Sequence, residues 1–205
     1  MKKTLCLVLV LSLAALFIPA LAAAQGETLT VYASFYPMYD FAQKIAGDKA
    51  RVVNMVPSGM EPHHWEPAAS DIVGLEEADV FIYNGAGMEH WVDKVLQSLS
   101  NRELTVVNTS EEVLLLDSRH AQGDHDHDEE HDHDHDEEHG HHHGDFDPHV
   151  WLGPLSAKGQ LEAIKNSLAA VDPGNAAYYE ENYEKYAAQF DALDEEFRAA
   201  LAPLP

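Results

Sequence analysis

Cysteine and basic residues are scarce in this sequence. Its 205 residues contain one cysteine, and 12 lysines and arginines stand against 36 aspartates and glutamates, which gives a formal net charge of −24. Because Cys6 lies in an N-terminal apolar run, we expect neither disulfides nor thiolate metal ligands in the folded part of the chain. The acidic balance argues against nucleic acid and anionic membranes as partners, and it attracts cations.

Apolar runs long enough to span a membrane are also missing. Two lysines precede an apolar run from Leu5 to Ile18, and three alanines follow at Ala22–Ala24. The run of about fourteen residues is shorter than the ~20 that a spanning helix needs. The pattern predicts a signal peptide over residues 1–24 and an exported, periplasmic protein with no membrane insertion after cleavage. Cys6 lies too early in the run for a lipid-attachment site.

Local motifs of hydrolytic enzymes are absent. The sequence has no HExxH string for a catalytic zinc and no local motif of a Ser-His-Asp triad. A catalytic zinc usually needs three protein ligands, an open position and a nearby base. The sequence therefore favours a binding protein over an enzyme.

Histidine, by contrast, is concentrated in one acidic segment. Ten of the 14 histidines lie between His120 and His143, without a lysine or arginine among them. Imidazole and carboxylate suit a borderline divalent cation such as Zn²⁺. Because residues 117–145 have almost no apolar side chains to bury, we predict a disordered loop there. Its possible auxiliary metal ligands are His125, His127, His131, His133, His135, His139, His141, His142 and His143.

Strand and helix patterns alternate along the rest of the chain. The predicted strands are Leu29–Tyr36, Arg51–Val56, Asp79–Tyr83 and Leu104–Asn108. The predicted helices run from Pro37 to Ile45, over Asp71–Glu77 behind a Ser70 cap, over Glu89–Leu99, over Ala157–Val171 behind a Ser156 cap, and over Asn175–Ala200. This alternation predicts an α/β fold with a mainly parallel four-stranded sheet flanked by helices, whose ligands lie at the carboxyl ends of the strands.

The last predicted helix carries an apolar stripe. Its members are three or four residues apart: Tyr179, Tyr183, Tyr186, Phe190, Leu193, Phe197 and Leu201. This spacing places them on one face. The stripe favours packing against a core or another domain over an aromatic binding surface.

Two five-residue strings share the pattern acid–Pro–His–x–Trp. They are Glu61-Pro62-His63-His64-Trp65 and Asp147-Pro148-His149-Val150-Trp151. Proline stiffens each turn, and the acid can orient the imidazole through its second nitrogen. Each histidine could instead be a turn residue packed under its tryptophan. The matched pair, together with the acidic histidine segment, favours His63 and His149 as metal ligands.

The chain resembles a known family, the metal-specific solute-binding proteins of ABC importers for zinc and manganese (cluster A-I). The resemblance rests on SFYPMYDFAQKIAGD, on MVPSGMEPHHWEPAASDIVGLEEADVFIYNGAGMEHWVDKVL, on DPHVWLGP and on VDPGNAAYYEENYEKY. Zinc-type members typically carry a histidine-rich acidic insertion at this place, so the resemblance favours zinc over manganese. It implies metal ligation by His63 and His149, no ligand role for His64, and either a structural or a metal-related role for Glu89, while His90 is expected to be a surface residue.

The resemblance also implies a domain organisation. A signal peptide (1–24) precedes an N-terminal lobe (25–116 and 146–174) that is interrupted by the histidine-rich loop (117–145), and a long linking helix follows (175–205). Family members add a second lobe that supplies a third and a fourth ligand. We expect this sequence to hold the first lobe and the linking helix without that second lobe, either as a fragment of a longer protein or as the product of a truncated gene.

The implied function is high-affinity capture of Zn²⁺ outside the cytoplasmic membrane and its delivery to an ABC permease, with no enzymatic reaction. The histidine-rich loop would then act as a zinc reservoir or sensor, or merely as a spacer. The alternatives are a stand-alone periplasmic zinc buffer or chaperone that uses the loop, and a manganese-type importer component.

Overall fold

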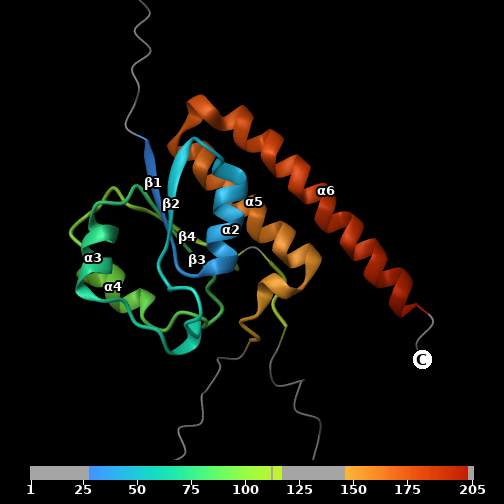
Figure 1. The fold of residues 1–205 in the computed structure, drawn as a ribbon, viewed down its shortest axis with the longest axis horizontal. Coiled ribbons are helices and arrows are strands. Elements are labelled where there is room, and N and C mark those ends of the chain that lie inside the picture. Colours follow the sequence, from blue (N-terminus) through green and yellow to red (C-terminus); the bar gives the residue numbers. More distant parts are fainter. Residues whose placement is uncertain (1–27, 112, 117–145, 203–205) are drawn as a thin grey trace, which may run out of the picture.

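The structure is a computed structural model that describes residues 28–111, 113–116 and 146–202 (Figure 1). The predicted signal peptide and the nine loop histidines named above lie outside the described residues. Among the helices that are described, none has the length and apolar character to cross a bilayer.

A four-stranded parallel sheet lies at the centre of the fold. Its strands β1 (Leu29–Ala33), β2 (Ala50–Asn54), β3 (Val80–Tyr83) and β4 (Thr105–Asn108) have the order β2-β1-β3-β4. All three pairings are parallel, and Val31 on β1 is opposite Val52 on β2 and Val80 on β3. Parallel neighbours require crossover connections, which the helices between the strands provide. The predicted parallel α/β fold is confirmed.

Helices cover both faces of this sheet. In Figure 1, α3 (Ala69–Glu76) and α4 (Val92–Ser98) lie on one side, and α2 (Tyr36–Ala46) and α5 (Pro154–Val171) lie on the other. Helix α6 (Ala176–Leu201) packs outside α5 and α2. The described segments also contain the single-turn 3₁₀ helices η1 (Pro62–His64), η3 (Val150–Leu152) and η4 (Pro173–Asn175).

Several predicted boundaries were wrong by a few residues. Strand β1 ends at Ala33, since α2 begins at Tyr36 with a proline in its first turn. The cap of α3 is Ala68, whose N–H donates to the Asp71 carboxylate (2.8 Å), rather than Ser70. A proline also starts α5, so Gly153 takes the cap position predicted for Ser156. Helix α4 starts three residues later than predicted because Glu89 binds a turn instead.

The apolar stripe of α6 is buried only along its first half. Tyr179 has no exposed surface, and Tyr183, Tyr186 and Phe190 are partly buried against the core. The second half is more exposed: Leu193 37%, Phe197 47% and Leu201 60%. The prediction of core packing is therefore confirmed as far as Phe190.

Candidate metal centre

The two predicted ligand histidines meet beyond the carboxyl ends of the strands. His63 belongs to η1, which follows β2, and His149 immediately precedes η3. Their Nε2 atoms are 3.3 Å apart. Two nitrogens bound to one tetrahedral zinc at about 2.0–2.1 Å lie about 3.3–3.4 Å from each other. The pair therefore has the spacing of two ligands on one zinc ion.

Glu61 fixes the turn that carries His63. Its carboxylate accepts from the backbone N–H of His63 (3.0 Å), the backbone N–H of His64 (3.1 Å) and the ring Nδ1 of His64 (2.6 Å). Partial burial acts to raise the pKa of Glu61, but these hydrogen bonds outweigh it and lower the pKa below its usual value. The His64 ring is thereby held at Glu61 and is not part of the His63–His149 pair.

Asp147 orients His149 in a different way, through the ring of the candidate ligand itself. Its Oδ1 accepts from the backbone N–H (2.9 Å) and the ring Nδ1 (2.7 Å) of His149. Since a carboxylate can only accept, Nδ1 carries the hydrogen and Nε2 keeps its lone pair for a metal. The His149 ring also packs on Trp151 at 5.4 Å between centroids, and Trp151 contacts Phe35 edge-on at 4.9 Å.

Glu89 is occupied by hydrogen bonds within the fold. Its carboxylate accepts from Ser34 Oγ (2.6 Å), Asn84 N (2.8 Å) and Gly85 N (3.0 Å). Burial raises the pKa of this carboxyl even though the three donors act in the opposite direction. Of the two roles left open by the sequence, the structure supports the structural one: Glu89 ties the end of β1 to the turn after β3.

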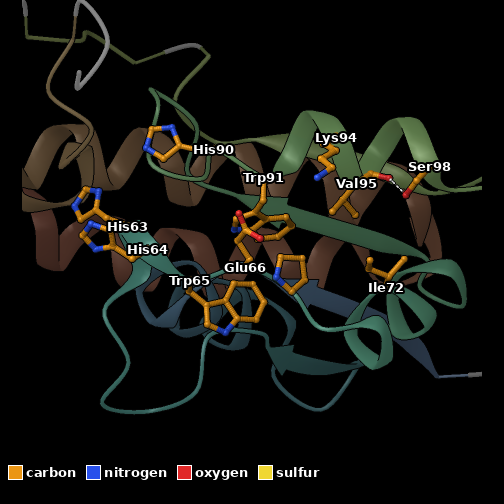
Figure 2. Close-up of a pocket in the computed structure, with 11 residues that line it drawn as sticks. His63, His64, Trp65, Glu66, Ile72, His90, Trp91, Lys94, Val95 and Ser98 are labelled. Carbon is orange, nitrogen blue, oxygen red and sulfur yellow. Dashed lines mark hydrogen bonds between the residues drawn. The ribbon is translucent and has the colours of Figure 1, made fainter. Parts of the chain in front are cut away.

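A cavity of about 560 Å³ extends away from the histidines, between α3 and α4. Trp65 and Trp91 line its middle, with His63 and His64 at one end (Figure 2). His90 is exposed on the cavity wall and is not paired with His63 or His149. The prediction that His90 is a surface residue is confirmed.

A third protein ligand does not join the pair within the part of the chain that the structure describes. No group of three or more His, Cys, Asp or Glu side chains there could hold a metal ion. A tetrahedral shell around His63 and His149 would need two more ligands. Their supply by a C-terminal lobe remains a prediction.

Sequence reasoning missed the buried residues behind the site. Asn84 donates to the carbonyl oxygen of Pro148 (2.9 Å), directly before His149, and Gln160 on α5 donates to Asn84 (2.8 Å). Only the strand-to-turn change at Asn84 was visible in the sequence. A sequence pattern gives no signal for contacts between positions so far apart.

Comparison with known proteins identifies the family. The family model described as "Zinc-uptake complex component A periplasmic" (ZnuA) matches residues 31–205. The chain belongs to the ZnuA family. The resemblance to zinc-type solute-binding proteins is confirmed.

Two relatives of this ZnuA-family chain have names that refer to zinc. The zinc-binding lipoprotein AdcA of Streptococcus pneumoniae serotype 4 is 38% identical over 198 residues, which cover 95% of this chain and 37% of that protein. The high-affinity zinc uptake system protein ZnuA of Bacillus subtilis is 40% identical over 174 residues, covering 85% of this chain and 52% of that protein. The chain thus spans about half or less of the length of these relatives.

Solved structures of the same family share the fold. The Zn(II)-bound ZnuA-like domain of Streptococcus pneumoniae AdcA has a TM-score of 0.67 at 31% identity, over 84% of this chain and 55% of that one. The metal-dependent lipoprotein YcdH of Bacillus subtilis has a TM-score of 0.68 at 33% identity, over 83% and 55%.

Proposed function

We propose that this chain binds Zn²⁺ through His63 and His149 as part of a solute-binding protein that captures zinc outside the cytoplasmic membrane. The observation that carries the proposal is the 3.3 Å separation of the two Nε2 atoms. The Asp147 contact, which leaves the lone pair of His149 on Nε2, supports it. The protein performs no chemistry on its cargo, which it binds and releases.

Zinc is the metal that this ligand pair favours. Imidazole suits zinc, whereas carboxylate, carbonyl and water ligands suit manganese. The names of the relatives AdcA and ZnuA point the same way. A manganese-type importer component is the alternative, and direct competition between Zn²⁺ and Mn²⁺ for the chain distinguishes the two.

The proposed location and partner come from the relatives. The family model carries the word periplasmic, and AdcA is called a lipoprotein. Both descriptions support a location outside the cytoplasm. We therefore propose an extracytoplasmic protein, in the periplasm as the signal sequence predicts, that delivers Zn²⁺ to the membrane subunit of an ABC permease.

Zinc titration against a chromophoric chelator tests the site. We expect one zinc site per chain that involves both histidines. Its affinity should fall at least about tenfold in His63→Ala and in His149→Ala, because each change removes a metal ligand, and even the change of a residue behind a ligand costs 10–100-fold. His64→Ala is the matched control, since its ring is held by Glu61. Equal affinity in all four proteins would refute the assignment of the two ligands.

A stand-alone zinc buffer is the second candidate, and the ten histidines of residues 120–143 favour it. Deletion of residues 120–144 separates the two. A carrier keeps its tight site and loses only weak additional zinc, whereas a buffer loses most of its zinc and is insensitive to His149→Ala. In cells grown at low zinc, unchanged uptake after the deletion would show that the segment is a spacer rather than a reservoir.

A further inference from the structure

A buried polar network lies directly behind His149. Asn84 and Gln160 have no exposed surface, and Thr109 is 1% exposed. The Asn84 amide donates to the carbonyl oxygens of Gly85 (2.9 Å) and Pro148 (2.9 Å), and it accepts from Gln160 Nε2 (2.8 Å). Gln160 also donates to Thr109 Oγ1 (2.9 Å). Both amide hydrogens of Asn84 and its oxygen are therefore used.

The network acts on the peptide unit that leads into His149. The Pro148 carbonyl and the His149 N–H belong to one rigid, planar peptide. Asn84 binds its carbonyl oxygen, and Asp147 binds its N–H at 2.9 Å. A planar group held at both ends cannot rotate, so the position of the His149 Cα is fixed, and the contact of Asp147 with the ring Nδ1 (2.7 Å) then orients the side chain.

The anchors of this peptide belong to the sheet and to α5. Asn84 follows β3, its backbone N–H is bound by Glu89, and Gln160 lies on a helix that packs against α2 and α6. Both anchors are separated in sequence from residues 117–145, which end two residues before Asp147 and three before Pro148. Buried amide hydrogen bonds are stronger than exposed ones because water does not compete for them.

We infer that Asn84, supported by Gln160, is a positioning residue that sets His149 at bonding distance from a metal on His63, whatever residues 117–145 do. The inference rests on the proposed zinc site. It adds which residues hold His149 in its binding position before the ion binds. Metal sites lose affinity when their ligands are displaced by about 0.5 Å, so the carbonyl anchor contributes to binding without touching the ion.

Asn84→Asp in the full chain tests this, with Thr109→Val as the matched control. Both substitutions keep side-chain size and remove hydrogen bonds from the same buried network, but only Asn84 contacts Pro148. Three measurements are made: Zn²⁺ affinity by chelator competition, the visible absorption of bound Co²⁺, and the urea midpoint of the metal-free protein.

We expect both variants to lower the urea midpoint. Asn84→Asp should weaken Zn²⁺ binding about tenfold and shift the Co²⁺ bands, as outer-shell changes do, whereas Thr109→Val should leave affinity within about twofold and the bands unmoved. If both variants lose affinity alike, or neither does, the positioning role is wrong and the network only stabilises the core.

A second variant and a wild-type measurement cover the case in which Asn84→Asp does not fold. Gln160→Met keeps Asn84 but removes its support, and it should weaken Zn²⁺ binding by more than the roughly twofold limit set for Thr109→Val. In the metal-free wild type, the Asn84 side-chain amide protons should exchange slowly with solvent; fast exchange would overturn the inference. The amide-exchange measurement needs no metal, so its outcome is independent of the ligand assignment. The ligand assignment fails separately, if His149→Ala binds zinc as tightly as wild type.

Discussion

Carboxylates hold the two candidate ligands by different contacts. Asp147 accepts from the ring of His149 itself, whereas Glu61 accepts from the backbone of His63 and from the ring of its neighbour His64. The two strings that look alike in sequence thus give two different arrangements. A carboxylate on the second nitrogen of an imidazole increases its basicity toward a metal, so the ligand strength of His149 depends directly on Asp147.

Replacing that carboxylate should weaken the site. Asp147→Asn keeps size and an acceptor oxygen but removes the charge, and we expect Zn²⁺ affinity to fall about 10–100-fold. Glu61→Gln is the matched control: it makes the same change in charge at the same place in its string, yet its ring contact is to His64. Chelator competition measures both. An equal loss in the two variants would show that net charge, rather than the ring contact, controls affinity.

The sequence predicted the ligand histidines but not the residues that place them. His63 and His149 were found from the repeated acid–Pro–His–x–Trp pattern, and the structure brings them together. Asn84 and Gln160 are 76 positions apart, and the asparagine is 64 positions from Pro148. Which partner a buried amide finds depends on how the sheet and helices pack, and local propensities do not contain that information.

At the scale of whole elements, all four strands and the five main helices were predicted, because their apolar periodicity is a local property. The ends were less well predicted. A proline lies in the first turn of α2, after Tyr36, and another starts α5. The Asp71 side chain caps α3 from inside the helix, so neither Ser70 nor Ser156 takes the cap position predicted for it.

The connection between α5 and α6 depends on one carboxylate. Asp172 Oδ2 accepts from Asn175 Nδ2 (2.6 Å) and from the hydroxyl of the fully buried Tyr179 (2.7 Å). The Asn175 contact and, against the opposing effect of partial burial, the Tyr179 contact lower the pKa of Asp172 below its usual value. Burial, together with the same contact, raises the pKa of Tyr179. This turn sets the direction in which α6 leaves the lobe.

This carboxylate should make stability depend on pH. Because its pKa is lower in the folded protein than in the unfolded chain, ionised Asp172 stabilises the fold above the unfolded pKa, and that stability is lost as pH falls through the folded value. We expect Asp172→Asn to reduce the free energy of unfolding by about 1–2 kcal/mol at pH 7 and by much less near pH 3. Urea unfolding at both pH values measures this, and Tyr179→Phe should show a smaller loss. A difference that does not change with pH would contradict the assignment.

The molecule as a whole is a lobe with one helix that extends past its core. The first half of α6 packs on α5 and α2, and Phe190 meets Phe41 edge-on at 5.8 Å. Next to Phe190, an ion pair between Lys158 on α5 and Asp191 on α6 (2.7 Å) also joins the two helices. Beyond it the apolar stripe continues but finds little cover among the described residues, although its spacing does not change. Periodicity predicts which face of a helix is apolar, but how far along that face the core reaches depends on the size of the lobe.

Two phenylalanines seven positions apart on α6 allow the packed and the exposed halves of this helix to be compared. Phe190→Ala removes a partly buried ring from its contact with Phe41, and we expect the free energy of unfolding to fall by about 1–2 kcal/mol, less than for a fully buried ring. Phe197→Ala changes the same residue type on the same helix, but this side chain is 47% exposed, so the expected change stays within about 0.5 kcal/mol. Because both variants replace Phe by Ala in the same helix, the change in helix propensity is similar in the two and does not affect the comparison. Urea unfolding of the metal-free chain supplies the comparison. If Phe197→Ala were as destabilising as Phe190→Ala, the far half of α6 would be packed against other parts of the chain, and the exposed stripe would be buried in solution.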